Sequence, residues 1–115
     1  MPVGVDIEDI ERFQNKSDGF LKRVYTPLEL EYCTKFSKPE SHLAVRFCAK
    51  EAVIKALTPL GINIAEYNII EVYFDKDENY PKVRVLKDIG KNIKFELSLS
   101  HDKSKAIAFV NVEEL

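Results

Sequence analysis

The segment between Pro39 and Gly61 constrains the fold of this 115-residue chain more than any other. Pro39 and Glu40 suit the first turn of a helix, and Pro59 with Gly61 ends it. At about 100° per residue, apolar side chains occupy nearly the whole circumference of this helix. These apolar residues are Leu43, Ala44, Val45, Phe47, Cys48, Ala49, Ala52, Ile54 and Leu57. Such a helix is predicted to lie at the centre of the molecule, covered by other elements.

Four charged residues interrupt the apolar helix in two pairs, Arg46 with Lys50 and Glu51 with Lys55. Side chains spaced four residues apart are neighbours on a helix and commonly form ordinary, weak ion pairs. A buried charge without a partner is unfavourable, so in a central helix these groups must be neutralised or used. We expect Arg46 and Lys50 either to line the same pocket wall as Lys55 or to neutralise the surface.

The sequence of the N-terminal part of the chain predicts one short strand and two helices that are shorter than the helix after Pro39. Residues 4–7 form an apolar run, typical of a strand, that Asp6 interrupts. The spacing of apolar residues indicates a short helix over residues 8–13. Residues 26–29, Thr-Pro-Leu-Glu, start a helix, with Thr as N-cap, Pro at the first position and Glu placed to close a capping box. That helix is predicted to run to about Phe36.

The second half of the chain predicts β-structure. Residues 69–75 and 82–86 are two strands joined by a turn, which makes a hairpin. Residues 95–100 alternate between apolar and polar, whereas residues 106–112 are apolar on both faces and predict a central strand. The expected class is α+β, with helices packed on a small antiparallel β-sheet in a single domain over residues 1–115.

Composition and charge narrow the possible partners. Lys and Arg number 17 and Asp and Glu 19, a net charge of −2 that argues against nucleic-acid or membrane binding through a basic field. The longest uncharged stretch, residues 56–65, is too short to span a membrane, and Asp6 argues against a signal peptide. Cys33 and Cys48 form no C-x-x-C pair and are expected to be reduced thiols. We therefore expect a cytoplasmic protein that binds neither nucleic acid nor membrane.

The standard phosphate-loop, serine-hydrolase and zinc-protease motifs are absent from the sequence. The candidates for a catalytic or binding role are therefore carboxylates and cationic side chains. Asp6 and Glu51 each interrupt an apolar segment, and two carboxylates suit Mg²⁺ when substrate phosphates complete its shell. Lys55, one turn after Glu51, can then reach a phosphate oxygen. Simpler interpretations stay open: Asp6 can cap a helix that starts at Glu8, and Glu51 with Lys55 can be an ordinary ion pair.

His101 is predicted to lie at the tip of a hairpin between the last two strands. Its imidazole is exposed and titratable there, which suits a catalytic or binding role. A solvated turn histidine is the simpler interpretation, and Asp102 after it can be a turn residue.

Four segments of the chain, in order, resemble the motifs of one enzyme family. GVDI at 4–7 resembles G-[IVL]-D-[IVL], and YTPLEL at 25–30 is similar to L-T-x-x-E-L. RFCAKEAVIKA at 46–56 resembles R-[FW]-A-A-K-E-A-x-x-K-A, and LSLSHD at 97–102 resembles S-[IL]-[ST]-H. They are spread over residues 4–102, so the resemblance extends over nearly the whole chain. They are similar to the holo-[acyl-carrier-protein] synthases, the small bacterial 4′-phosphopantetheinyl transferases of fatty-acid biosynthesis.

The resemblance implies a homotrimer of small α+β domains with its active sites at the subunit interfaces. It implies Mg²⁺ as the metal, held by Asp6 and Glu51, with coenzyme A as co-substrate and apo-acyl carrier protein as partner. The implied catalytic residues are Glu51, Lys55 and His101. The coenzyme site would be lined by Arg46, Phe47, Lys55, Pro81 and His101.

The implied reaction moves 4′-phosphopantetheine from coenzyme A to a serine hydroxyl of the carrier protein and releases 3′,5′-ADP. Glu51, directly or through a bound water, is the first choice to take the serine proton, with His101 or Asp102 as alternatives. The alternative function is a non-catalytic module that binds a carrier protein or senses a nucleotide. Retention of Asp6, Glu51 and Lys55 together favours the enzyme.

The chain departs from the family pattern in two places. The hairpin turn has Asn79 and Tyr80 before Pro81, where the family usually has Gly. The family's first helical region is commonly basic, whereas residues 8–23 carry four cations and four acids. Docking of the carrier protein is therefore expected to use fewer cations and more apolar contact, through Phe13 and Phe20.

Overall fold

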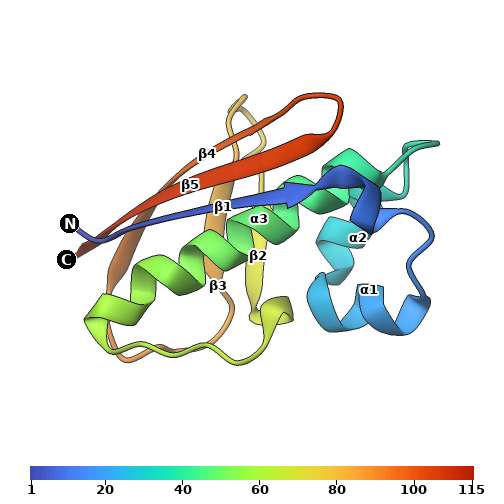
Figure 1. Ribbon diagram of the computed structural model, residues 1–115. Helices are drawn as coiled ribbons and strands as arrows, with labels where there is room; N and C mark the ends of the chain where they lie inside the picture. The colour runs from blue at the N-terminus through green and yellow to red at the C-terminus, as the bar shows by residue number, and fades with distance from the viewer.

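The central helix α3 (Glu40–Leu57) lies along a three-stranded antiparallel sheet in the computed structural model, which describes residues 1–115 (Figure 1). The strand order is β1 (Val3–Asp9), β5 (Lys105–Glu114), β4 (Ile93–His101). The strand nearest the N-terminus thus pairs with the last strand of the chain, and both termini lie at the same end of the sheet (Figure 1). The central position predicted for the helix is confirmed.

Along β5, residues that point to the buried inner face of the sheet alternate with residues that point to its exposed outer face. On β5 the small or branched residues Ala106, Ala108, Val110 and Val112 are fully buried against α3. The intervening residues, such as Phe109, are exposed. β5 is the central strand, as predicted, but only one of its two apolar faces is covered.

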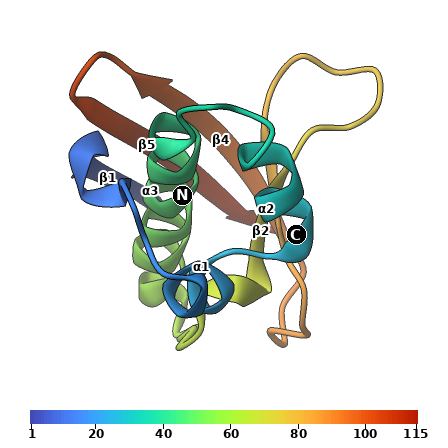
Figure 2. The ribbon, with the colours of Figure 1, turned by 90° about the vertical axis from the view of Figure 1, so that its right-hand side faces the viewer.

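A second, two-stranded sheet consists of β2 (Ile70–Tyr73) and β3 (Lys82–Val85). This corrects the expectation of a single sheet: β3 forms no ladder with β4, and a groove of about 660 Å³ lies between them. Figure 2 shows that α3 is surrounded by the larger sheet, by α2 and β2, and by α1. This surrounding explains why nearly every side of the helix is apolar.

The helices before α3 are short. β1 continues to Asp9, so the helix expected over residues 8–13 is a 3₁₀ turn, η1 (Ile10–Phe13), and α1 (Asp18–Val24) follows. Because Asp6 lies within a strand, the alternative that it caps a helix is wrong. The capping box that opens α2 (Pro27–Cys33) is confirmed, although the helix ends before Phe36. Two further 3₁₀ turns connect α3 to β2, η2 (Thr58–Leu60) and η3 (Tyr67–Ile69).

A buried ion pair joins α2, α3 and β2. Lys50 Nζ lies 2.8 Å from Glu29 Oε1, and both side chains are fully inaccessible to solvent. Lys50 also donates to the carbonyls of Tyr67 and Ile70, and Glu29 Oε2 accepts from the Val72 amide at 2.8 Å. Lys50 therefore stabilises the interior, and the expectation that it lines a wall with Lys55 or neutralises the surface is wrong.

No helix of this structure combines the length and the apolar character that crossing a membrane requires. Cys33 and Cys48 are both buried and both free. The prediction of two unpaired thiols is confirmed.

Replacing Gly4 by alanine is expected to lower the free energy of unfolding by about 1–3 kcal/mol, because β1 crosses α3 without room for a side chain. A Cβ atom at Gly4 would overlap the Ala52 carbonyl oxygen and lie 3.0 Å from the Ala56 amide nitrogen, both backbone atoms. Urea denaturation measures the change. Gly19→Ala is the control, since its Cβ would lie 3.6 Å from the nearest atom, in helix α1, and should leave stability unchanged or raise it. Equal stability of the two variants would contradict the prediction.

Candidate active site

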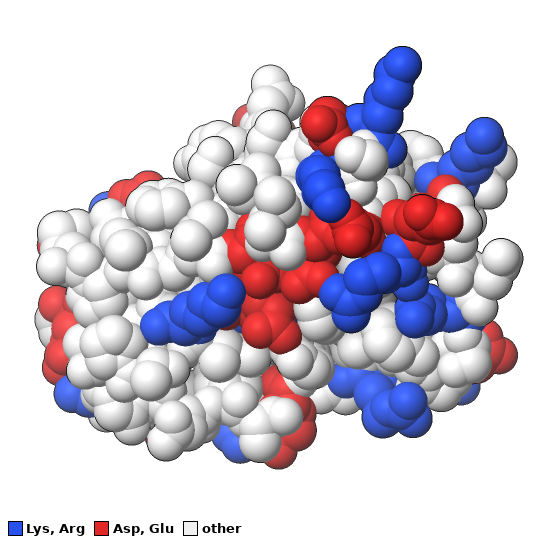
Figure 3. Space-filling model, in the orientation of Figure 1, with Lys and Arg blue, Asp and Glu red and all other residues white.

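Three carboxylates lie together between β1 and α3. Asp6 and Glu8 alternate along β1 opposite the buried residues Ala108 and Ala106, so both project toward α3. Glu51 extends from α3 close enough for its charge to act on Glu8. Figure 3 shows acidic side chains gathered in the middle of this face, with basic side chains around them. We call Asp6, Glu8 and Glu51 the acidic cluster.

Asp6 has one carboxylate oxygen in use and one without a partner. Its side chain is 11% exposed, and Oδ1 lies 3.3 Å from Lys55 Nζ. Oδ2 is buried and accepts no hydrogen bond. A buried, unpartnered acceptor is rare in proteins and indicates a place for a further ligand such as a cation.

Glu8 is a member of the cluster that was not among the site residues predicted from the sequence. Burial raises its pKa to about 7, and the neighbouring Asp6 adds to that rise. Arg12 acts in the opposite direction through its ion pair with Glu8. The available signal was the D-x-E spacing, because residues two apart on a strand share a face.

Glu51 is held by a residue outside its own helix. Its Oε1 accepts a hydrogen bond of 2.6 Å from the hydroxyl of Tyr67. This hydrogen bond, together with burial, raises the pKa of Tyr67 to about 12, so the hydroxyl keeps its proton at neutral pH. Tyr67 belongs to none of the motifs in the sequence and lies in the connection between α3 and β2.

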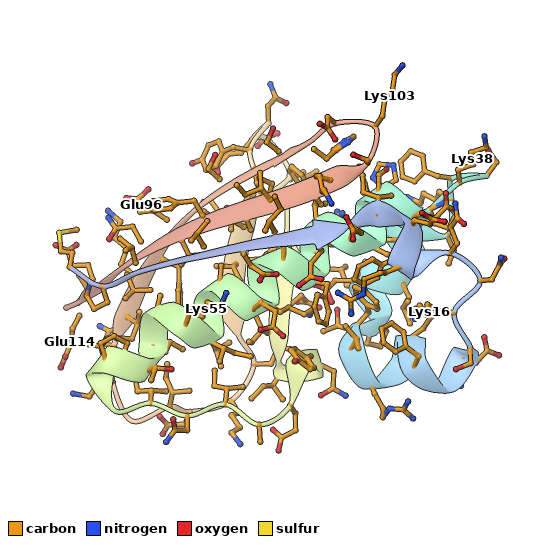
Figure 4. All side chains as sticks on the ribbon, in the orientation of Figure 1. Lys16, Lys38, Lys55, Glu96, Lys103 and Glu114 are labelled. Atoms are coloured by element: carbon orange, nitrogen blue, oxygen red, sulfur yellow. The ribbon has the colours of Figure 1, made fainter.

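Lys55 contacts β1 and leaves Glu51 free of an ion pair. Its Nζ donates to the Val5 carbonyl at 3.0 Å and also contacts Asp6. Figure 4 shows the Lys55 side chain on α3. The alternative of an ordinary ion pair between Glu51 and Lys55 is therefore wrong. About half of the Lys55 side chain is exposed, so its ammonium group can move from Asp6 to an arriving anion.

Phe47 lies beside the acidic cluster in a row of aromatic rings. Its ring centroid is 5.3 Å from that of Phe13 and 5.2 Å from that of Tyr67. Phe13 is only 3% exposed, so it does not offer the apolar docking contact that the sequence suggested. Phe20 is partly buried against the same core.

Arg46 lies on another side of α3, about 140° from Glu51 around the helix axis. It is 4% exposed, stacks 4.5 Å from the Tyr32 ring centroid and donates to the His42 carbonyl at 3.1 Å. Its Nε is buried without a partner. Arg46 lines a pocket of about 520 Å³ between α2 and the β2–β3 hairpin, and we call this the arginine pocket. Other residues of its lining are Tyr32, Lys35, Phe74 and Asn79.

Pro81 and His101 also lie away from the acidic cluster. Pro81 borders the groove between β3 and β4. His101 is the last residue of β4 and is exposed. The pKa of His42 is lowered by burial, by the charge of Arg46 and, to a smaller extent, by the charge of His101. Asp102 Oδ1 accepts from the amides of Ser104 and Lys105, which lower its pKa and define it as a turn residue.

The expected site residues thus fall into two groups in one chain. Asp6, Glu51, Lys55 and Phe47 come together, whereas Arg46, Pro81 and His101 do not join them. No three acidic, histidine or cysteine side chains are arranged to hold a metal by themselves. The oxygen donors of the acidic cluster nevertheless fit Mg²⁺, which usually takes one or two carboxylates and fills its shell with water and substrate oxygen.

Comparison with known proteins gives concordant matches. A family model described as the 4′-phosphopantetheinyl transferase superfamily matches residues 2–110. A holo-[acyl-carrier-protein] synthase of Thermodesulfovibrio yellowstonii is 40% identical over 113 residues, covering 94% of each chain. One from Caldicellulosiruptor saccharolyticus is 40% identical over 121 residues, covering 97% of this chain and 95% of the relative.

Solved structures of similar proteins share the fold. The complex of the Chronobacterium ammoniagenes synthase with coenzyme A has a TM-score of 0.83 at 25% identity, covering 99% of this chain and 97% of that one. The Bacillus anthracis synthase, in complex with coenzyme A (3′,5′-ADP), has a TM-score of 0.78 at 30% identity, covering 98% and 95%. The α+β fold expected from the resemblance is confirmed.

Proposed function

Since the chain belongs to the 4′-phosphopantetheinyl transferase superfamily, we propose that it is a holo-[acyl-carrier-protein] synthase acting as one catalytic domain over residues 1–115. It transfers 4′-phosphopantetheine from coenzyme A to a serine hydroxyl of an apo-acyl carrier protein of fatty-acid biosynthesis. The observation that carries the proposal is the acidic cluster beside Lys55, with an unpartnered carboxylate oxygen on Asp6.

Asp6 and Glu51 would hold Mg²⁺, with Glu8 next to them. The buried Oδ2 of Asp6 supports this assignment, because a cation there would satisfy the one buried acceptor of the cluster that lacks a partner. When bound, Mg²⁺ would neutralise negative charge on the diphosphate of coenzyme A.

Three side chains of this chain perform the remaining work at the acidic cluster. Lys55 leaves Asp6 and contacts an oxygen of the diphosphate, since it is tethered only by contacts of 3.0 and 3.3 Å. Glu51 accepts the proton of the serine hydroxyl while the serine oxygen forms its bond to the β-phosphorus of coenzyme A. The bond from that phosphorus to the oxygen of 3′,5′-ADP breaks, and the nucleotide leaves. Phe47 forms an apolar wall that helps to exclude water.

The arginine pocket suits the nucleotide part of coenzyme A. Arg46 is a buried cation with a free donor, and Arg recognises phosphate through several donors at once. Tyr32 and Phe74 offer aromatic faces on which an adenine ring can stack. Asn79 of the unusual hairpin turn lines this pocket, although Pro81 faces the neighbouring groove.

A complete site requires two copies of the chain, because the acidic cluster and the arginine pocket lie on different sides of α3. We propose a homotrimer in which the acidic cluster of one copy faces the arginine pocket and His101 of the next. The exposed apolar face of the larger sheet supports this assembly, because a contiguous apolar surface indicates an interaction site. Its residues are Val3, Val5, Ile7, Ile107 and Phe109, which are 40–59% exposed.

Phe109→Arg is expected to convert the trimer into monomers and to abolish transfer. Phe109 pairs with Val5 at the centre of the apolar face, so a charge there would be buried without a partner in the assembly. Size-exclusion chromatography with light scattering measures the assembly, and circular dichroism checks the fold. Leu86→Arg, at an equally exposed leucine outside this face, is the control. A trimeric Phe109→Arg variant would contradict the proposed interface.

The function is tested by incubating the protein with apo-acyl carrier protein, coenzyme A and Mg²⁺. Mass spectrometry should show the phosphopantetheine adduct on the carrier protein, and 3′,5′-ADP should appear in equal amount. A carrier protein with alanine at the acceptor serine is the control. Binding of coenzyme A without adduct at any Mg²⁺ concentration would favour the non-catalytic module.

A further inference from the structure

Tyr67 occupies a position that the proposed chemistry does not yet use. It lies in η3, outside the four segments that resemble the family, and its hydroxyl donates the 2.6 Å hydrogen bond to Glu51 Oε1. A carboxylate has two oxygens that can accept from two directions. With Oε1 fixed by the tyrosine, the other oxygen of Glu51 is the one free to meet a cation or a proton.

Three independent contacts fix Tyr67 itself. Its ring lies 5.2 Å from that of Phe47, its hydroxyl is bound to Glu51, and its backbone carbonyl accepts from Lys50 Nζ at 3.2 Å. Lys50 is in turn held by Glu29 in the buried ion pair. The tyrosine is therefore attached to α3 through residues 47, 50 and 51, over little more than one helical turn.

Glu51 has no other partner that fixes its side chain. It takes part in no ion pair, because Lys55 contacts Asp6 and Val5 instead. A glutamate side chain has several rotamers of similar energy, and ordering it requires a specific interaction. The tyrosine hydroxyl supplies that interaction before any ligand arrives.

We infer that Tyr67 is a positioning residue for Glu51, which orients the carboxylate so that one oxygen faces Asp6 and the divalent cation. The inference rests on the proposed function for the identity of the cation. The hydroxyl touches neither substrate nor metal in this role. It acts on the ligand, as hydrogen-bond partners of metal-binding carboxylates commonly do.

Tyr67→Phe removes the hydroxyl and keeps the ring against Phe47. Cation affinity is expected to fall about 10-fold to 100-fold, the range found when partners of metal ligands are removed. The probe is Mn²⁺, titrated into the whole protein with and without coenzyme A and followed by electron paramagnetic resonance. The Mg²⁺ concentration needed for half-maximal transfer should rise with it, while the affinity for coenzyme A alone stays unchanged.

Two further variants separate positioning from a general loss of structure. Tyr25→Phe is the control, since it also removes a buried tyrosine hydroxyl, which donates to the Leu43 carbonyl at 2.7 Å and makes no hydrogen bond to Glu51. In a Glu51→Gln background, Tyr67→Phe should have no further effect on Mn²⁺ affinity if it acts through Glu51 alone. An equal decrease in both backgrounds would overturn the inference.

The outcomes distinguish this inference from the proposed function. Normal transfer with unchanged or tighter Mn²⁺ binding in Tyr67→Phe would overturn the positioning role and leave the function intact. Mn²⁺ binding that weakens in Tyr67→Phe, in a protein that transfers nothing, would support positioning and overturn the function. Absence of Mn²⁺ binding by the unsubstituted protein, even with coenzyme A, would overturn both.

Discussion

Replacing Glu51 by glutamine is expected to reduce phosphopantetheine transfer by at least about 100-fold, and by up to about 10,000-fold if the carboxylate acts as the base. Glutamine keeps the length of the side chain and can still accept from the Tyr67 hydroxyl, which now donates to Glu51 at 2.6 Å. It cannot accept the serine proton, and its neutral amide is a poor ligand for Mg²⁺. The fold should be retained, because Glu51 lies outside the buried core.

The measurement is the initial rate of adduct formation with saturating coenzyme A, followed by mass spectrometry. Glu66→Gln is the matched control, since Glu66 is an exposed glutamate whose only ion pair is with Lys87 at 3.7 Å. Near-normal transfer by a folded Glu51→Gln protein would refute the role assigned to Glu51. Recovery of the rate at high Mg²⁺ would instead assign the defect to metal binding and leave the base to be found elsewhere.

Lys50→Met is expected to lower the free energy of unfolding by about 3–5 kcal/mol. Lys50 and Glu29 are 2.8 Å apart and inaccessible to solvent, so removing the ammonium group leaves a buried carboxylate without its counter-charge. The carbonyls of Tyr67 and Ile70 lose a donor as well. Methionine fills most of the lysine volume, so the decrease would reflect charge rather than a cavity.

Urea denaturation of Lys50→Met and of Lys55→Met, on the same helix, tests this prediction. Lys55 is half exposed and solvent reaches its ammonium group, so its removal should change stability much less than the removal of Lys50. The two variants should also differ in function. Lys55→Met is expected to lose transfer while staying folded, whereas Lys50→Met loses activity only as far as it unfolds or displaces Tyr67. Similar stability of the two variants would contradict the importance of the buried pair.

Local patterns predicted the elements whose cause is local. The capping box at Thr26 and Glu29 formed as expected, because its two hydrogen bonds join residues three apart. The helix from Glu40 to Leu57 formed for a similar reason, since its apolar residues lie within it and Pro39 and Pro59 flank it. The central strand was predicted from an apolar run, although the exposure of Phe109 on its outer face could not be.

The sequence by itself determined most of the helices and strands, the class of the fold and the identity of Asp6, Glu51 and Lys55 as residues able to do chemistry. Tertiary structure decided which charges pair. Lys55 contacts Asp6, 49 residues away, and Lys50 contacts Glu29 across the core. An ion pair between neighbours on a helix is worth only about 0.2–0.5 kcal/mol, so it yields to packing that orders a side chain elsewhere. Only the approach of β1 and η3 to α3 brings Glu8 and Tyr67 to Glu51, and no local pattern determines that approach.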